Sequence, residues 1–186
     1  MSYSLPAIES LTSQPKAAQE EALTHLFEPC ETLNAIVTSQ VLVPENQGQM
    51  KSYRDMIELV RKTLNNILDT DDKDPRVSKI IAAHPRLGAP KNVKLSAHSE
   101  AEQANLKAAS EAQAAKLSEL NKKYEEAFPG LRYVVFVNGR TREVIMENMI
   151  ARIERNDIAA EKREAFNAMC DIALDRASKL LNTAQL

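Results

Sequence analysis

Residues 53–68 read YRDMIELVRKTLNNIL, and this stretch decides the fold class. Its apolar side chains recur at the spacing of one face of an α-helix, with charged and polar side chains on the other face. The apolar positions are Met56, Ile57, Val60, Leu64 and Leu68. Residues 53–68 are therefore predicted to form an amphipathic helix whose apolar face packs on a core.

The composition of the whole chain favours the same kind of structure. The 186 residues include only four glycines and no tryptophan, and 44% of them are apolar. This supplies a core large enough for one domain, and the abundance of helix-forming residues favours helix over sheet. Further helices are predicted over residues 5–11, 15–27, 30–40, 75–83, 99–127, 141–154 and 158–182. Since the sequence shows no repeat and no domain boundary, residues 1–186 are expected to form a single-domain helical bundle of the all-α class.

One short run breaks the helical pattern. Residues 132–137 read RYVVFV, a strongly β-prone segment, and the turn-forming pair Asn138-Gly139 follows it. The chain offers no clear partner strand, although the buried N–H and C=O groups of an extended segment need partners. Two interpretations are open. The segment pairs with a short loop, or some of its backbone groups bind a polar ligand.

Charge and cysteine content narrow the class of protein. The chain carries 24 basic and 26 acidic residues, for a net charge of −2, which gives no sign of a nucleic-acid partner. No stretch approaches the roughly 20 apolar residues of a membrane span, and the N-terminus lacks a secretory signal. Cys30 and Cys170 match no metal-ligand spacing and suggest a reducing, intracellular compartment.

A histidine at a stiff corner is the first candidate for chemistry. Residues 82–90 read AAHPRLGAP, so His84 directly precedes Pro85. Proline disfavours the helical conformation in the residue before it, which places His84 on extended backbone just past a helix end. This arrangement suits an imidazole that points into a cleft, although many ordinary loops end helices in the same way.

A second candidate lies at the start of the helix predicted over 99–127. Glu102 precedes Leu106 by four residues and therefore extends the apolar face of that helix. Ser99 and Glu102 also fit a capping box, in which neither residue does chemistry. Both interpretations can hold together, because a helix start capped by Ser99 leaves N–H groups near residues 101–103 that suit an anion or a carbonyl.

A third candidate, Arg176, falls on the apolar line of the last helix, seven residues after Met169. An unpaired buried guanidinium is costly. Arg176 therefore either extends its charged end to the surface or pairs with a carboxylate, from Glu102 or from a ligand. Together, His84, Glu102 and Arg176 suggest a recessed site with an acid/base histidine, a carboxylate and an anion clamp.

A metal site is a weaker interpretation of the same region. His98 and Glu102 are four residues apart and could share a metal ion with His84, as in a metal-dependent hydrolase. Three ligands in no standard motif do not predict a metal. His25 lies in an amphipathic helix and is expected to be structural.

Four motifs, taken in order, resemble a known enzyme family. They are HPRLG (84–88), SEAEQANL (99–106), LNKKYEEAF (120–128) and YVVFVNGRT (133–141), followed by an arginine late in the final helix. Their order and spacing resemble 2-oxo-4-hydroxy-4-carboxy-5-ureidoimidazoline decarboxylase (OHCU decarboxylase) over roughly residues 20–182. Enzymes of this family catalyse the last step from urate to (S)-allantoin.

The resemblance implies an all-α homodimer that decarboxylates this small molecule without a cofactor or a metal. It implies that His84 is the catalytic acid/base and that Glu102 and Arg176 are the catalytic carboxylate and arginine. The residues with implied substrate contacts are Pro85, Ser99, Glu100, Ala101, Glu102, Gln103, Tyr133, Val134, Val135, Phe136 and Val137.

The chemistry of such a site sets expectations for individual side chains. His84 is expected to titrate near neutral pH, where it can take and give a proton. A clamp that held the leaving carboxylate tightly would stabilise the ground state, so Arg176 is expected to organise Glu102 instead. Gln103 is expected to bind substrate carbonyls.

Two questions stay open at this level. A non-enzymatic helical scaffold or adaptor, with the helix near 99–128 as its partner surface, is the alternative function. A peroxisomal location is expected because urate oxidation yields peroxide, and the terminal Ala184-Gln185-Leu186 is a weak relative of the Ser-Lys-Leu address. The cytoplasm is the alternative location.

Overall fold

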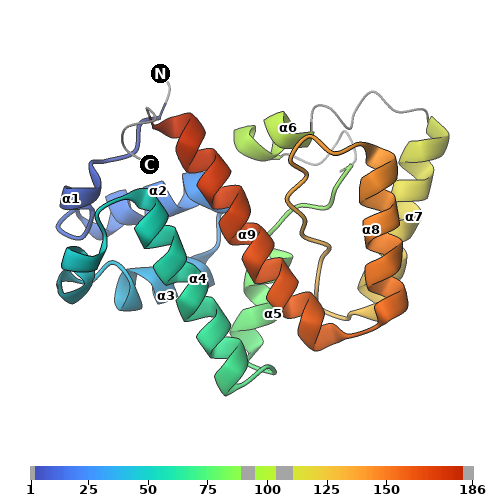
Figure 1. Cartoon of the computed structure of the whole chain (residues 1–186), viewed down its shortest axis with the longest axis horizontal. Coiled ribbons are helices and arrows are strands. Elements are labelled where there is room, and N and C mark those ends of the chain that lie inside the picture. Colours follow the sequence, from blue (N-terminus) through green and yellow to red (C-terminus); the bar gives the residue numbers. More distant parts are fainter. Residues whose placement is uncertain (1–2, 89–94, 104–110, 182–186) are drawn as a thin grey trace.

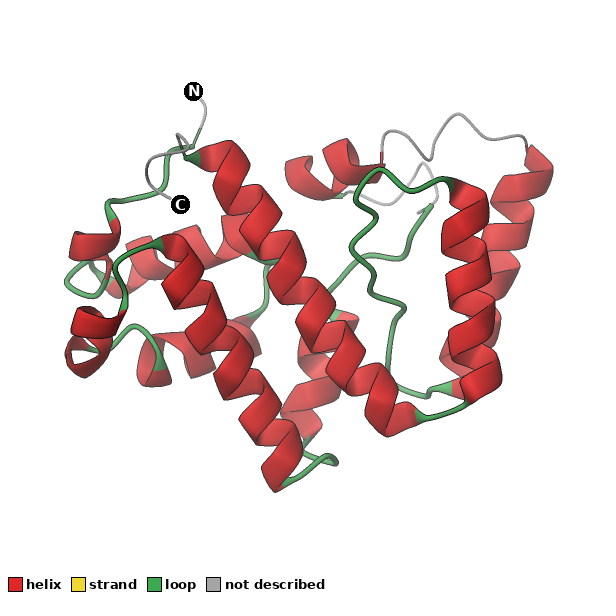
Figure 2. Cartoon of the chain, viewed as in Figure 1, coloured by secondary structure: helices red, strands yellow, loops and turns green. Residues whose placement is uncertain are grey.

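The computed structural model describes residues 3–88, 95–103 and 111–181. Its elements are α1 (Ile8–Leu11), α2 (Lys16–Leu26), α3 (Glu31–Gln40), the 3-10 helix η1 (Pro44–Gln49), α4 (Tyr53–Thr70), α5 (Pro75–Ala82), α6 (Ala97–Gln103), α7 (Glu111–Ala127), α8 (Arg142–Arg155) and α9 (Ile158–Leu180). These described residues contain no strand (Figure 2), which confirms the predicted all-α fold.

Helix α9 runs through the middle of the molecule and joins its two sides (Figure 1). It packs along α4 and also contacts α2 and α5. The apolar face predicted for residues 53–68 is buried in this packing, and Met56, Ile57, Val60 and Leu64 are fully enclosed. Burial of such a face is the main source of helix stability in a folded domain. The same packing fixes α9, which carries Arg176.

Side chains fix where the two central helices begin. The Ser52 hydroxyl accepts a hydrogen bond from the Asp55 N–H at the start of α4. The Asp157 carboxylate accepts one from the Ala160 N–H at the start of α9. Each cap satisfies an N–H group that has no partner within its own helix.

Helices α7 and α8 pack against each other on the other side of α9. The chain between them returns as a loop that lies between α8 and α9 (Figure 1). The β-prone run 132–137 lies in this loop and belongs to no strand among the described residues. One helix was predicted over 99–127. The structure has α6 and α7 instead, pointing in different directions, and residues 104–110 between them lie outside the described residues.

A membrane crossing was not expected from the sequence. Of the helices in residues 3–88, 95–103 and 111–181, none combines the length and the apolar character that a bilayer span requires.

Candidate active site

A cavity of about 210 Å³ lies between α9, α6, the loop after α5 and the loop segment 133–139. Nearly all of the predicted site residues line it: His84, Pro85, Ser99, Ala101, Glu102, Gln103, Tyr133, Val134, Val135, Phe136, Val137 and Arg176. Glu100 differs from this set, since it is exposed and does not line the cavity. Four segments that are distant in sequence therefore meet at one place.

Arg176 is the centre of a buried hydrogen-bond network on one wall. Its side chain is 2% exposed. Its Nε and Nη2 atoms donate to the two carboxylate oxygens of Glu102, at 2.7 and 3.0 Å. Nη1 donates to the Phe27 carbonyl at 2.6 Å, and Nη2 also reaches Glu28 Oε1 at 2.9 Å and Ser99 Oγ at 3.4 Å. The predicted pairing of Arg176 with Glu102 is confirmed, and the catalytic role of the pair stays a prediction.

These contacts also decide the charge of Arg176. Burial alone lowers the pKa of the guanidinium, but the hydrogen bond and charge of Glu102, followed by those of Glu28, raise it overall. The group therefore stays protonated in the interior. The alternative in which its charged end only reaches for the surface is wrong.

Glu28 also belongs to this network, although it was not predicted from the sequence as a site residue. It is 4% exposed, accepts from Arg176 and also accepts a short hydrogen bond from the Ser99 hydroxyl. Its local sequence carried the signal, because Glu28 precedes Pro29 just past the end of α2 as His84 precedes Pro85 just past the end of α5.

The capping box predicted at Ser99 is one turn out of place. Helix α6 begins at Ala97, and the hydroxyl of Ser96 accepts from the Ser99 N–H at 3.2 Å. Ser96 is therefore the cap, which frees the Ser99 side chain to bind Glu28. Glu102 lies in the last turn of α6, where Arg176 holds it at the cavity wall with 21% of its side chain exposed.

The His84 side chain contrasts with that of Arg176, because one of its ring nitrogens is buried without a hydrogen-bond partner among the described residues. His84 is 5% exposed, and the carbonyl of this residue accepts from Arg132 Nη1 at 3.0 Å. Its Nε2 atom is buried and has no hydrogen-bond partner among the described residues. A lone buried polar atom of this kind is costly, and its position beside a cavity gives a ligand a place to bond.

Burial lowers the pKa of His84 to about 4, with Glu28 opposing the shift and Arg176 adding to it. The expected titration near neutral pH is therefore wrong for the protein without ligand. Desolvation disfavours the charged imidazolium, so His84 is neutral at pH 7. A neutral imidazole can accept a proton at once, which suits the start of a reaction that begins with proton removal.

All five residues of the segment 133–137 line the cavity. Within the part of the chain that the structure describes, no protein acceptor bonds any of its five N–H groups. Its carbonyls are held by side chains instead, since Arg152 Nη1 donates to Val134 O and Arg140 donates to Phe136 O and Val137 O. The interpretation with a paired strand is wrong here, and the free N–H groups favour the interpretation with a ligand.

The side chain of Gln103, which was expected to bind substrate, is bonded to the protein instead. The amide oxygen of Gln103 accepts from the Gly88 N–H at 2.9 Å, and its Nε2 atom donates to Arg86 O at 3.4 Å. Gln103 therefore ties α6 to the loop after His84. Asp175 and Lys179 line the cavity from α9, where they form an ion pair at 2.7 Å. Neither was predicted from the sequence.

The residues proposed for a metal site do not converge. His98 Nε2 lies 3.1 Å from His25 Nδ1, and the His25 ring stacks on Tyr3. In the described ranges no group of three or more His, Cys, Asp or Glu side chains is placed to hold a metal ion. The predicted residues that do meet at one cavity include His84, Glu102 and the segment 133–137.

Two known proteins are similar to this chain. The uric acid degradation bifunctional protein PucL of Bacillus subtilis (strain 168) is 25% identical over 151 residues, which cover 81% of this chain and 30% of that protein. The crystal structure of an (S)-allantoin synthase has the same fold, with a TM-score of 0.66 at 16% identity over 96% of this chain and 55% of that chain. This chain thus spans only part of the length of either relative.

A family model described as OHCU decarboxylase matches residues 12–178. This range includes every residue that brings a side chain to the Arg176 network and to His84. The chain belongs to the OHCU decarboxylase family.

Proposed function

We propose that this protein decarboxylates 2-oxo-4-hydroxy-4-carboxy-5-ureidoimidazoline and releases (S)-allantoin. One observation carries the proposal: the buried, unbonded Nε2 of His84 and the carboxylate of Glu102 line the same small cavity. A neutral base and a fixed carboxylate in a recessed site are what this reaction asks of a protein.

The substrate supplies its own electron sink. Its ring carbon carries both the carboxylate and a hydroxyl, and it neighbours a ring C=N bond. When the bond to the carboxylate breaks, CO₂ leaves and the electron pair moves toward the C=N carbon. The ring nitrogen then takes a proton from solvent, so no external electron acceptor is required.

The hydroxyl proton completes the balance. Neutral His84 accepts it, which lets the hydroxyl carbon become a carbonyl. The imidazolium so formed delivers the proton to the neighbouring ring carbon. Delivery from one side of the ring gives a single enantiomer. The net change is the loss of CO₂ and the uptake of one solvent proton.

The rest of the cavity orients the substrate for these steps. The unbonded N–H groups of 133–137 suit the carbonyl oxygens of the ring and the ureido group. Glu102 accepts from a substrate N–H or O–H. Arg176 spends its donors on protein acceptors, so it fixes Glu102 without gripping the carboxylate that must leave.

The test is direct turnover of freshly generated urate-oxidation intermediate, followed by the appearance of optically active allantoin over the slow racemic background. The variant His84→Asn should fold and lose about 10²–10⁴-fold in kcat, the usual cost of removing a general acid/base. His25→Asn is a matched control, because His25 does not line the cavity. Near-normal turnover by purified His84→Asn would refute the role of His84.

Assembly and location are further proposals that rest on the family resemblance. If the protein is a homodimer, analytical ultracentrifugation should give a mass of twice the 20.7 kDa of the chain. A peroxisomal protein should co-sediment with peroxide-forming enzymes on cell fractionation, and recovery in the cytosolic fraction alone would contradict it.

A further inference from the structure

The segment 133–137 is a thin wall between two hollows. The cavity with His84 lies on one side, and a second, more open hollow of about 480 Å³ lies on the other. Val135, Phe136 and Asn138 line both. No strand among the described residues backs this wall, so core packing of Tyr133 and Val134 and a few hydrogen bonds to its carbonyls hold it in position.

Arg152 makes the buried one of these contacts. It projects from the last turn of α8, is 5% exposed, and donates from Nη1 to Val134 O at 3.1 Å. Its guanidinium also lies 4.7 Å from the ring centre of Tyr133, within cation–π range. Arg152 therefore holds two consecutive residues of the wall from the side away from His84.

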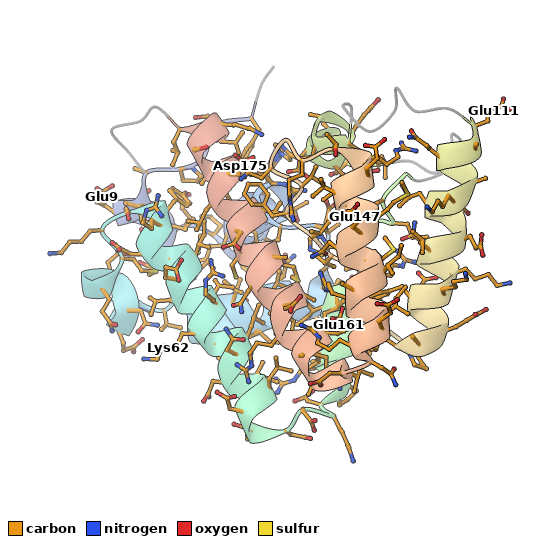
Figure 3. The ribbon with its side chains drawn as sticks, turned by 45° about the vertical axis from the view of Figure 1, so that its right-hand side comes forward. Glu9, Lys62, Glu111, Glu147, Glu161 and Asp175 are labelled. Atoms are coloured by element: carbon orange, nitrogen blue, oxygen red, sulfur yellow. The ribbon has the colours of Figure 1, made fainter. Side chains whose placement is uncertain are left out.

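Buried partners hold Arg152 itself in place. Its Nε donates to Glu161 Oε1 at 2.8 Å, and Glu161 is fully buried in the first turn of α9. Tyr124 donates to the same oxygen of Glu161 at 2.6 Å. Figure 3 labels Glu161 near one end of α9 and Asp175, a cavity residue, near the other, so one helix carries both the partner of Arg152 and part of the cavity lining.

We propose that Arg152 is a positioning residue for substrate binding. It acts through the Val134 carbonyl and sets where the free N–H groups of 133–137 stand in the cavity. The inference rests on the proposed function for its kinetic consequence, but the order of the wall can be measured without any substrate. Hydrogen bonds weaken steeply when donor and acceptor move out of line, so a displaced wall should bind the substrate less tightly.

A merely structural ion pair predicts something different. If Arg152 served only to neutralise Glu161, any cation at position 152 would suffice. Arg152→Lys separates the two roles, because one compact ammonium can stay on Glu161 but lacks the planar fork that reaches Glu161 and Val134 O together. Arg155→Met is the matched control. Arg155 also bonds Glu161, at 2.6 Å, but makes no contact with 133–137 among the described residues.

The experiment compares wild type, Arg152→Lys and Arg155→Met by kinetics on the urate-oxidation intermediate and by NMR order parameters of the backbone. Arg152→Lys should raise KM about tenfold with kcat within about threefold, because substrate binding is lost more than chemistry. Its order parameters over 133–137 should fall toward the flexible range below about 0.6. Arg155→Met should change neither quantity.

Equal KM values and equal order parameters in wild type and Arg152→Lys would overturn the proposal. So would equal changes in Arg155→Met. If Arg152→Lys does not fold, the double variant Arg152→Gln/Glu161→Gln replaces it, since it leaves no unpaired buried charge. If wild type shows no turnover, the proposed function fails, and the order parameters of the wall still decide the role of Arg152.

Discussion

Two buried arginines support two walls of the cavity, Arg176 from within it and Arg152 from behind the segment 133–137. Arg176 and Arg152 are 2% and 5% exposed, each binds carboxylates, and each donates to a backbone carbonyl. Glu102, the partner of Arg176, lines the cavity, whereas Glu161, the partner of Arg152, is fully enclosed. One network therefore places a carboxylate at the cavity, and the other supports the wall without exposing a carboxylate to the cavity.

The balance of formal charge explains the difference. Around Arg176, one guanidinium meets two carboxylates, Glu28 and Glu102. The surplus negative charge is tolerable where one carboxylate reaches the cavity and can be solvated or bonded. Around Glu161, two guanidiniums meet two carboxylates, so the formal charges balance, with Glu161 and Arg152 buried and Arg155 and Glu164 partly exposed. An unbalanced negative charge beside a cavity therefore favours a site in which a carboxylate contacts a ligand.

The largest difference should come from removing each guanidinium. Arg176→Met leaves Glu28 and Glu102 together without a cation, which should cost about 3–5 kcal/mol of unfolding free energy and abolish turnover. Arg152→Met should cost less, about 2 kcal/mol, because Glu161 keeps Arg155 and Tyr124. Urea denaturation of both variants measures the two costs. Equal losses would show that the charge imbalance has no energetic meaning.

Acid should affect the wall with His84 and leave the other wall unchanged. The pKa of His84 is about 4 in the folded protein because of burial, and an unfolded histidine titrates near 6.5. Between these values the unfolded chain binds more protons, so stability falls as pH drops from about 6.5 toward about 4, by on the order of 3 kcal/mol.

Denaturation at a series of pH values, for wild type and for His84→Asn, isolates this contribution. The stability curve of His84→Asn should be flatter between about pH 6.5 and about pH 4, while Arg152→Lys should keep the wild-type slope. In wild type, kcat/KM should stay level down to about pH 5 and fall as His84 becomes protonated near pH 4. Parallel stability curves for wild type and His84→Asn would contradict the buried, neutral state of His84.

The two carboxylates should separate catalysis from stability. Glu102→Gln keeps the shape but loses the charge at the cavity, so kcat should fall about 10²-fold with a small change in melting temperature. Glu161→Gln should do the reverse, with a clear loss of stability and less than about a tenfold change in kcat, because it leaves Arg152 and Arg155 short of a buried counter-charge. A pair of variants that lost activity to the same degree would remove the distinction between the two walls.

Local patterns were sufficient to predict most of the helices and three of the groups at the site, but not the division of 99–127 into α6 and α7. The apolar repeat in 53–68 predicted α4, because burial of one face decides helix formation in a domain. Arg176 was predicted because it follows Met169 by seven residues on a buried line. Arg152 shows the same spacing, since it follows the buried Ile145 by seven residues and Met149 by three. Its burial was not predicted from the sequence.

Other features depend on contacts that no local pattern contains. The partner of Glu28 is Arg176, 148 residues away. The sequence around Glu28 therefore indicates a turn but does not indicate the ion pair. Ser96 and Ser99 are equally good caps by composition and both donate to Glu28, so only the start of α6 at Ala97 makes Ser96 the cap. The low pKa of His84 follows from complete enclosure, which the His84-Pro85 motif alone does not predict.

The smallest effect should come from the outermost member of the Arg152 network. Glu164 lies 3.2 Å from Arg152 Nε and 2.7 Å from Arg155 Nη1, but 43% of its side chain is exposed. Exposed ion pairs contribute about 0–1 kcal/mol because solvent already stabilises both charges. Glu164→Gln should therefore lower the unfolding free energy by less than about 1 kcal/mol in urea and leave KM unchanged. A loss as large as that of Glu161→Gln would mean that the network depends on its solvent-facing end, and then Arg152 would not be fixed from the interior.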